Sequence, residues 1–234
     1  MNLFKKLAPT YAMVLAAFLI LTLLGNQAVT TWAENTNLGD KPVFVIDAGH
    51  GGIDGGATSC TGVLESQFNL QIALRLNDLL RFLGHETLMI RTTDKSVYTY
   101  GNTIAAQKVS DLKQRVKIAN ETENGILISI HQNIFSDGRY SGAQVFFAPD
   151  EESREVAAKL QTNLIQTLNP GSNRKSKKAD GIYLMEHINR PGILIECGFL
   201  SNTEEESKLR SPEYQKHLCA VIATTLSGHF REGK

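Results

Sequence analysis

The sequence predicts a single α/β domain with a mostly parallel central sheet of about six strands flanked by helices. Apolar runs rich in β-branched residues alternate along the chain with segments of helical apolar spacing, and turn residues separate the two kinds of segment. The chain has 234 residues, which is enough for one such domain with a substantial core. Because no internal repeat is present, we expect one folded domain spanning residues 43–230.

The N-terminal segment has the pattern of an export signal. Lys5 and Lys6 precede an apolar run between Tyr11 and Leu24. We expect residues 1–33 to be a signal peptide or an N-terminal membrane anchor, and the sequence leaves both open because the apolar run is also long enough for a tilted span. Residues 34–42 are polar and predict a linker. The chain is therefore expected to be exported from the cytoplasm.

Composition excludes two classes of protein. The 24 basic and 24 acidic residues balance, whereas a nucleic-acid-binding protein normally carries a basic excess. Three cysteines, Cys60, Cys197 and Cys219, are too few for the disulfide framework of a small secreted domain. Stability must therefore come from the apolar core, and we expect the cysteines to behave mainly as small core residues.

The elements are predicted from apolar periodicity, caps and turn residues. Strands are expected at 43–47, 86–92, 126–131, 142–148, 181–185 and 192–198, and helices at 65–83, 111–123, 150–168 and 212–226. Residues 97–110 are expected to be a surface excursion, with a capping box at Asp111 opening the second helix. A polar turn is expected from Asn202, before the last helix.

The first strand ends in a glycine-rich loop that contains a histidine. The loop runs Asp47-Ala48-Gly49-His50-Gly51-Gly52, directly after the apolar run that begins at Val43. Glycines let other groups approach the backbone closely, and sites in parallel sheets form at the carboxyl ends of strands. His50 is therefore a candidate metal ligand, although such a loop could equally hold a phosphate.

Three ionisable residues end runs that are apolar enough to be central strands: His50, His131 and Glu196. Glu65 begins the helix that returns from the His50 loop. Because buried ionisable groups are costly unless they are paired or bound to a metal, one shared cation is the simplest partner for all four. Two histidines and a carboxylate, with a fourth position left for water, are typical of a catalytic zinc site. The alternative is a set of separate polar groups with hydrogen bonds in the core.

The two glutamates are expected to have different roles. Glu65 shares a crossover with His50 and can bind the metal, which leaves Glu196 to take the proton from water at the metal during amide hydrolysis. Spacing alone permits the reverse assignment. Cys197 follows Glu196 in an alternating strand and should point away from the site.

Three further features have open roles. Cys60 lies between the first histidine and Glu65 and could approach the metal. His187 precedes the last strand and could contact substrate or lie at the surface. The basic loop from Arg174 to Lys178 could receive substrate carboxylates, although most such runs are simply solvated.

Several motifs follow one another along the chain in a fixed order. They are the His50 loop, Glu65 with Asn69, Arg91-Thr92-Thr93-Asp94, Arg115 with Ala119-Asn120, Ser129-Ile130-His131-Gln132-Asn133, and Ile195-Glu196-Cys197-Gly198-Phe199-Leu200-Ser201-Asn202. Together they resemble the zinc-dependent N-acetylmuramoyl-L-alanine amidases. The resemblance covers residues 43 to 230. Its departures are Ala48 where many members have proline, Gln132 and Ile134 around Asn133, and Cys197 where valine is common.

The resemblance implies a function and a set of site residues. It implies that His50, Glu65 and His131 bind one zinc ion and that Glu196 is the catalytic glutamate. The implied reaction is hydrolysis of the amide between the lactyl group of N-acetylmuramic acid and the L-alanine of the peptidoglycan stem peptide. Within the same motifs, Asp47, Asn69 and Asn133 are candidates for contacting substrate or supporting the ligands.

The layout narrows the resemblance further. An N-terminal apolar segment joined directly to the domain, together with residues 181–185 and 141–144, is similar to the germination-specific spore-cortex amidases of sporulating bacteria. This similarity implies action in the forespore envelope ahead of muramic-δ-lactam formation. The alternatives are a catalytically silent peptidoglycan-binding or regulatory module and a zinc peptidase that cuts within the stem peptide. An activating protein partner is compatible with the sequence, and oligomeric state is not indicated by it.

Overall fold

The structure, a computed structural model, describes residues 41–232. The expected signal or anchor segment and nearly all of the expected linker lie outside the described residues. The compact unit begins at Pro42. Within the described part of the chain, no helix combines the length and the apolar character needed to cross a membrane.

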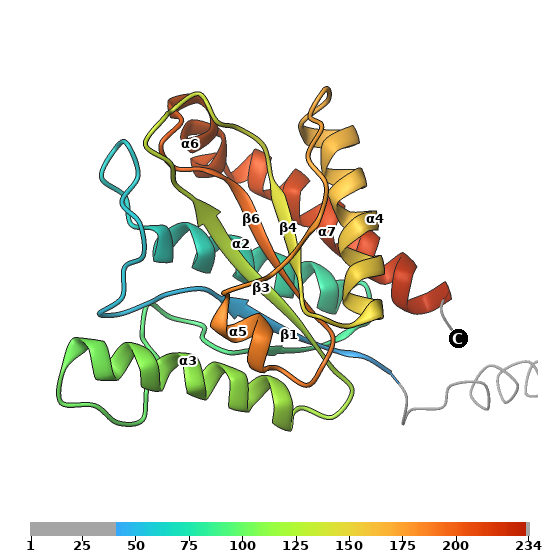
Figure 1. Cartoon of the computed structure of the whole chain (residues 1–234). Helices are drawn as coiled ribbons and strands as arrows, with labels where there is room; N and C mark the ends of the chain where they lie inside the picture. Colours follow the sequence, from blue (N-terminus) through green and yellow to red (C-terminus); the bar gives the residue numbers. More distant parts are fainter. Residues whose placement is uncertain (1–40, 233–234) are drawn as a thin grey trace, which may run out of the picture. The chain divides into compact units, whose positions relative to one another are not determined.

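A six-stranded sheet forms the centre of the described domain (Figure 1). The strands are β1 (Val43–Ala48), β2 (Glu86–Met89), β3 (Gly125–Asn133), β4 (Gln144–Phe147), β5 (Lys177–Lys178) and β6 (Gly192–Phe199). Their order across the sheet is β2-β1-β3-β6-β4-β5, and every pairing is parallel except that of β4 with β6. The predicted α/β class, with a mostly parallel sheet, is confirmed.

Helices cover both faces of this sheet. On one face lie α2 (Glu65–Phe82), α4 (Glu151–Leu168) and α7 (Pro212–Glu232), and on the other lie α3 (Ile104–Glu121) and the short α5 (Tyr183–His187). A further helix, α6 (Thr203–Arg210), follows β6 and packs against α7. This three-layer arrangement buries most residues of β1, β3 and β6, which explains why their sequences are nearly continuous apolar runs.

Strand alternation divides the buried side chains between two apolar cores. Phe44 and Ile46 pack with α2 and α7, whereas Val45 belongs to the core under α3 and α5. Each such side chain contributes about 1.5–3 kcal/mol when fully buried. On the α3 side, the apolar residues Val45, Leu127 and Leu194 are followed at two-residue spacing by Asp47, Ser129, His131 and Glu196. This face is therefore apolar along most of its length and polar at the carboxyl ends of β1, β3 and β6.

The second helix starts earlier than the sequence predicts. Thr103 is its N-cap, and the Thr103 side chain accepts a hydrogen bond from the Ala106 amide at 3.2 Å. Asp111, expected to open the helix, lies inside it and accepts hydrogen bonds from the Val97 amide at 2.6 Å and from Arg115 at 2.6 Å. The predicted capping box was wrong because Asp111 satisfies a neighbouring loop and an arginine rather than its own helix terminus.

Two other elements also differ from the prediction. Residues 181–185, expected to form a strand, instead contain a turn and the first residues of helix α5, which starts at Tyr183. The edge strand β5 lies upstream, in the basic loop. Glu186 of α5 accepts a hydrogen bond from the Gly181 amide at 2.6 Å, which supports this turn. The expected polar turn at Asn202 is the N-cap of α6, because its side chain accepts from the amides of Glu204 and Glu205. Four apolar residues do not distinguish a strand from one helical turn.

Candidate metal centre

The histidine loop after β1 is held in an uncommon backbone conformation. His50 has a φ of 60°, in the left-handed region that residues with a side chain seldom adopt. Arg115 donates from Nη2 to the His50 carbonyl at 2.7 Å. Such a conformation persists only when its surroundings enforce it, and the arginine supplies part of that enforcement.

Two buried arginines hold the carbonyl oxygens of this loop. Arg91 donates to Ala48 at 2.7 Å and to Gly49 at 3.0 Å, and Arg115 donates to Ala48 at 3.0 Å. The exposed fractions of Arg91 and Arg115 are 4% and 2%. The planar guanidinium, with five fixed donors, is suited to bridging several carbonyls at once. The loop that carries His50 is therefore held by the side chains of Arg91, which follows β2, and Arg115 of α3.

Asp47 neutralises one of these arginines. Its carboxylate forms a buried ion pair with Arg115 and accepts a hydrogen bond from the Ser129 hydroxyl at 2.7 Å. Burial would raise the pKa of Asp47, but the positive charge of Arg115 outweighs burial and holds the pKa below its ordinary value. Asp47 therefore supports the loop through its contacts with Arg115 and Ser129.

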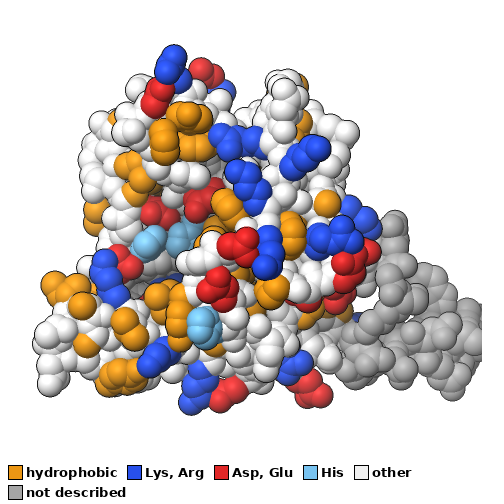
Figure 2. All heavy atoms as spheres, in the orientation of Figure 1, with side chains coloured by type: hydrophobic (Ala, Val, Ile, Leu, Met, Phe, Trp, Pro, Cys, Tyr) orange, Lys and Arg blue, Asp and Glu red, His pale blue; other side chains and the backbone are white. Residues whose placement is uncertain are grey.

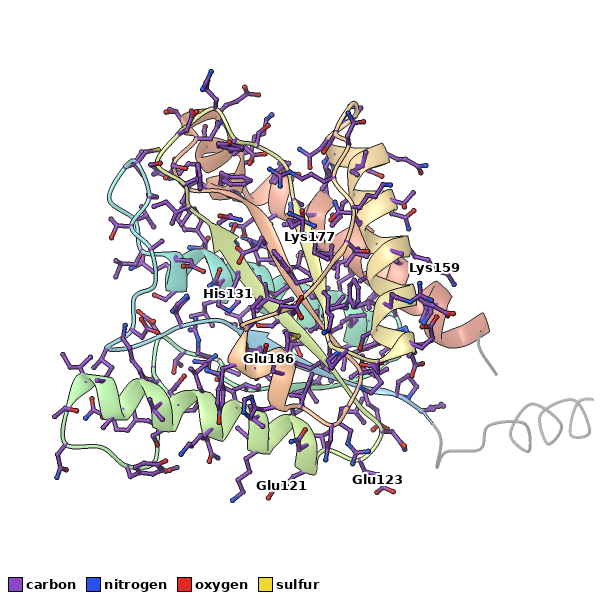
Figure 3. The ribbon with its side chains drawn as sticks, viewed as in Figure 1. Glu121, Glu123, His131, Lys159, Lys177 and Glu186 are labelled. Atoms are coloured by element: carbon purple, nitrogen blue, oxygen red, sulfur yellow. The ribbon has the colours of Figure 1, made fainter. Side chains whose placement is uncertain are left out.

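Three side chains from different elements converge at the carboxyl edge of the sheet. His50, Glu65 and His131 each offer one ligand atom, and these atoms all lie within 4.8 Å of one another. Glu65 is central, because its Oε2 lies 3.2 Å from His50 Nε2 and its Oε1 lies 3.0 Å from His131 Nδ1. Figure 3 labels His131 at this edge, and Figure 2 shows the pale blue histidines beside red carboxylates on the same open face. The predicted ligand set is thus brought together in space.

Two glycines provide the space for this convergence. A Cβ at Gly49 would overlap the His131 imidazole. A Cβ at Gly56 would lie 2.6 Å from Glu65 Oε2 and 2.7 Å from His50 Cδ2, and Gly56 also has a φ of 69°. Both positions therefore exclude larger residues, which accounts for the glycine-rich character of the loop.

The Glu65 carboxylate is oriented by hydrogen bonds as well as by the histidines. Oε2 accepts from the Ala57 amide at 3.0 Å, and Oε1 accepts from the Gln132 amide at 3.2 Å and from Asn69 Nδ2 at 3.3 Å. Burial would raise the pKa of Glu65, but the two histidines outweigh it and lower the pKa far below the ordinary value. Asn69 also donates to the Gly49 carbonyl at 3.1 Å, so it links Glu65 to the His50 loop.

The outer nitrogen of His50 has a partner that the sequence analysis missed. Nδ1 lies 2.8 Å from Asp54 Oδ2, and Lys108 of α3 lies 2.8 Å from the other oxygen of Asp54. A carboxylate on the second ring nitrogen fixes the ring orientation of a metal-binding histidine. Burial lowers the pKa of His50, but Glu65 and Asp54 outweigh it and raise the pKa to about 9. The sequence offered one signal for this contact, the position of Asp54 four residues after His50. It offered none for Lys108, which lies in the segment expected to be a surface excursion.

Glu196 lies beside this cluster. It pairs with His131 in the parallel register of β3 and β6. Its Oε2 is buried and has no hydrogen-bond partner among the described residues. Burial raises the pKa of Glu196 to about 7, with His131 and His50 opposing the rise and Glu65 adding to it. A carboxyl group with this pKa can both accept and release a proton near neutral pH.

The remaining predicted residues differ in burial and in the contacts they make. Asn133 ends β3, and its carbonyl accepts from the Leu200 amide at 2.8 Å. Cys197 is buried in the core with Cys219, so its predicted orientation away from the site is confirmed. Cys60 is exposed. His187 is exposed and stacks on Tyr183 with ring centroids 3.9 Å apart, which favours its reading as a surface histidine.

A cavity of about 340 Å³ opens from the cluster toward α3 and α5. Its volume is at the lower end of the range of about 300–1,000 Å³ found for ligand pockets. It is lined by residues of the histidine loop, α3, the start of α5 and the strand ends: Asp47, Gly49, His50, Asp54, Lys108, Asp111, Leu112, Arg115, His131, Gly181, Ile182, Tyr183, Leu184 and Leu194.

Comparison with known proteins identifies the family. The model of the N-acetylmuramoyl-L-alanine amidase family Amidase_3 matches residues 44–227. The chain belongs to this family. The amidase is 38% identical over 192 residues to the germination-specific N-acetylmuramoyl-L-alanine amidase of Bacillus subtilis (strain 168), an alignment that covers 81% of this chain and 80% of the relative. It is 27% identical over 236 residues to the amidase AmiA of Escherichia coli (strain K12), covering 82% of this chain and 77% of the relative.

Solved structures agree with this assignment. The CwlD amidase of Clostridioides difficile, solved in complex with the GerS lipoprotein, matches with a TM-score of 0.78 and 34% identity, covering 82% of this amidase and all of that chain. An N-acetylmuramoyl-L-alanine amidase from Clostridium difficile 630 matches with a TM-score of 0.71 and 28% identity, covering 83% of this amidase and all of that chain. The resemblance inferred from the sequence motifs is confirmed, and the chain is an amidase.

Proposed function

We propose that this amidase hydrolyses the amide between the lactyl group of N-acetylmuramic acid and the L-alanine of the peptidoglycan stem peptide, with Glu196 as its general acid and base. The convergence of His50, Glu65 and His131 beside a buried glutamate is the single observation that carries the proposal. Family membership supports peptidoglycan as the substrate.

The donor set fits zinc. Two imidazoles and one carboxylate are the protein ligands of many catalytic zinc sites, and the absence of cysteine distinguishes the set from a structural one. Glu196 Oε2 is buried without a hydrogen-bond partner in the described domain. The charges of His131, Glu65 and His50 all influence the pKa of Glu196, so this carboxyl group lies close to the same cluster. His50, Glu65 and His131 would hold the ion. When bound, zinc acidifies water and polarises a carbonyl oxygen.

The protein's own groups supply the proton transfers and the alignment. Glu196 accepts the proton of the attacking water and delivers it to the leaving L-alanine nitrogen, a role that suits a pKa of about 7. Asn69 and Asp54 keep Glu65 and His50 in their orientations. Arg91 and Arg115 keep the loop fixed, so little reorganisation accompanies the reaction.

Digestion of purified peptidoglycan by the full-length chain tests this proposal. We expect release of whole stem peptides with newly exposed L-alanine amino groups, detected by mass spectrometry, in the presence of zinc and not after chelation. Cuts within the stem would support the zinc peptidase alternative instead. Absence of any cut by zinc-loaded protein would support the silent binding module.

The position of this amidase among its relatives supports a role in the spore cortex. The relative from Bacillus subtilis is a germination-specific amidase. The proposed role is removal of stem peptides ahead of muramic-δ-lactam formation in the forespore envelope. In a strain that lacks the gene, we expect cortex muropeptides without muramic-δ-lactam, and complementation by wild type but not by Glu196→Gln should restore the lactam.

Export and a protein partner complete the proposal. Relatives that act on the cell wall work outside the cytoplasm, and the charged and apolar N-terminal pattern is suited to export. The Clostridioides difficile amidase was solved with a lipoprotein, which supports an extracytoplasmic partner here too. Affinity purification of the tagged full-length chain from sporulating cells should recover one stoichiometric envelope protein. Recovery of the chain alone, fully active, would refute the need for a partner.

A further inference from the structure

Two exposed aromatic rings on the connection between β3 and β4 pack on a buried ring of β6. We call Phe135, Tyr140, Phe199 and Arg174 the aromatic platform. Phe135 and Tyr140 have exposed fractions of 51% and 47%, and their ring centroids are 4.7 Å apart in an edge-to-face arrangement. Tyr140 stacks on Phe199 at 6.1 Å, and the Arg174 guanidinium lies 5.1 Å from the Phe199 ring centroid. The result is a cluster of packed rings in which Phe135 and Tyr140 are about half exposed.

The platform lies at the same edge of the sheet as the metal centre. Phe199 is three residues beyond Glu196 on β6, and it pairs with Asn133, two residues beyond His131 on β3. A strand rises about 3.3 Å per residue, so Phe199 lies about 10 Å along the strand from Glu196. In Figure 2, orange side chains over the β3–β4 connection lie above the pale blue histidines on the same face. A ligand can therefore contact both places at once.

Hydrogen bonds to the backbone hold the platform in place. Glu205 of α6, with an exposed fraction of 6%, accepts from the Gly142 amide at 2.8 Å and from the Phe199 amide at 2.9 Å. Asn202 donates to the Tyr140 carbonyl at 3.3 Å. Arg174 donates to the Ser141 carbonyl at 3.2 Å, so its charge is engaged within the protein. Rings that are already ordered bind a ligand without a further entropic cost.

The substrate must extend in two directions from the metal centre. The scissile bond joins a sugar to a peptide, so the two parts of the substrate must leave Glu196 in different directions. The cavity toward α3 and α5 is lined by charged groups of both signs, including Lys108 and Asp54, which suit the polar amide, amino and carboxylate groups of a peptide. The platform exposes the aromatic side chains of Phe135 and Tyr140, and aromatic rings suit the C–H faces of sugar rings.

We propose that the aromatic platform binds the glycan strand of the substrate by stacking of sugar rings on Phe135 and Tyr140, while the stem peptide occupies the cavity beside α3. This inference rests on the proposed peptidoglycan amidase function and assigns a direction to the substrate. The platform is a binding surface for an extended glycan, so a substrate with a single sugar should gain little from it.

Binding of peptide-free glycan strands tests the platform separately from catalysis. Glycan strands stripped of stem peptides are titrated into the full-length chain by calorimetry. We expect Phe135→Ala with Tyr140→Ala to weaken binding about tenfold, which corresponds to about 1.4 kcal/mol. Phe135→Leu with Tyr140→Leu keeps the apolar bulk of the loop and should cause the same loss, which excludes unfolding as the cause.

The matched control is Phe82→Ala. Phe82 is 86% exposed and lies at the far end of α2 from Glu65, about 25 Å away along the helix. This variant should bind glycan as the wild type does. A platform variant that binds glycan as tightly as wild type would overturn the inference, and so would a wild-type chain that does not bind peptide-free glycan.

Kinetics separate this inference from the proposed function. On a muramyl peptide with one sugar, the platform variants should keep kcat/KM within about threefold of wild type, whereas on polymeric peptidoglycan KM should rise about tenfold. An equal loss of kcat/KM on both substrates would mean that the platform contacts the stem peptide or takes part in the reaction itself, and it would refute the assignment. If the proposed amidase function were wrong, the wild type would instead cleave neither substrate.

Discussion

Glu196 of β6 lies directly beside His131 of β3, because the two residues are paired in the parallel register. Replacement of Glu196 by Gln should remove the proton acceptor and keep the shape of the site. We expect kcat to fall by a factor of about 10²–10⁴ while zinc content stays near one ion per chain. Assay of stem-peptide release together with metal analysis measures both. Glu155→Gln, an exposed change on α4, is the control, and wild-type turnover by Glu196→Gln would mean that another group is the base.

Removal of the metal should stop the reaction without unfolding the domain. The His50 loop is held by hydrogen bonds from Arg91 and Arg115 to its carbonyl oxygens, and these bonds do not involve a metal. Chelation should therefore leave the circular dichroism spectrum unchanged but lower Tm and abolish amide cleavage. Added zinc should restore the cleavage, and it should restore Tm because zinc binds only the folded state. His50→Ala should lose zinc-dependent stabilisation as well as activity. A zinc-dependent rise in Tm that survives in His50→Ala would place the ion elsewhere.

The Arg115–Asp47 pair should be necessary for stability. Arg115→Met leaves the Asp47 carboxylate buried without its cation, and we expect the free energy of unfolding to fall by about 3–5 kcal/mol. Urea denaturation measures the loss. The control is Arg139→Met, which removes a surface pair with Asp137 and should leave stability unchanged. Equal stabilities of the two variants would contradict a structural role for the buried pair.

The same pair should make stability depend on pH. Because the pKa of Asp47 is lowered in the folded protein, its charged form stabilises the fold above the unfolded-state value of about 3.9, and this contribution is lost as pH falls through the lower folded-state pKa. The difference in free energy of unfolding between wild type and Asp47→Asn should be constant from neutral pH to about pH 5 and should shrink below about pH 4. A difference that stays constant down to pH 2 would exclude this linkage.

Gly49 should tolerate no side chain. A methyl group there would overlap the His131 imidazole, so Gly49→Ala must displace a proposed ligand. We expect zinc affinity to fall at least about tenfold, since even changes behind the ligands cost about 10–100-fold. Competition with a chromophoric chelator gives the affinity. Gly228→Ala, on α7 with open space around the added methyl group, is the control and should preserve affinity.

The sequence predicted the site residues at the strand ends better than the residues that hold them in position. His50, His131 and Glu196 follow long apolar runs, and such runs identify buried strands whose carboxyl ends meet at one edge. The contact between Asp54 and Lys108 depends on how α3 packs across the loop, and no local pattern encodes it. The same limit applies to the pair of Asp47 with Arg115, whose residues are 68 positions apart in the chain.

Missed elements have a common cause. The start of α3 carries the exposed side chain of Ile104, and α6 is almost entirely polar, so neither shows the apolar spacing that predicts a helix. Their caps, Thr103 and Asn202, were the usable local signals. For α5, five residues are too few for a helical period to be recognised, and packing against α3 and β6 decides the conformation.

The reversal of β4 affects how this family can diversify. Because β4 runs antiparallel to β6 and begins opposite Glu196, the connection from Asn133 to Gln144 leaves and re-enters the sheet at the same edge. Every parallel crossover must instead return across the whole domain through a helix. Residues can therefore be inserted into or exchanged within this connection without disturbing a core helix or a ligand-bearing strand. Selection could thus retune which wall polymer is recognised while the hydrolytic machinery is inherited intact.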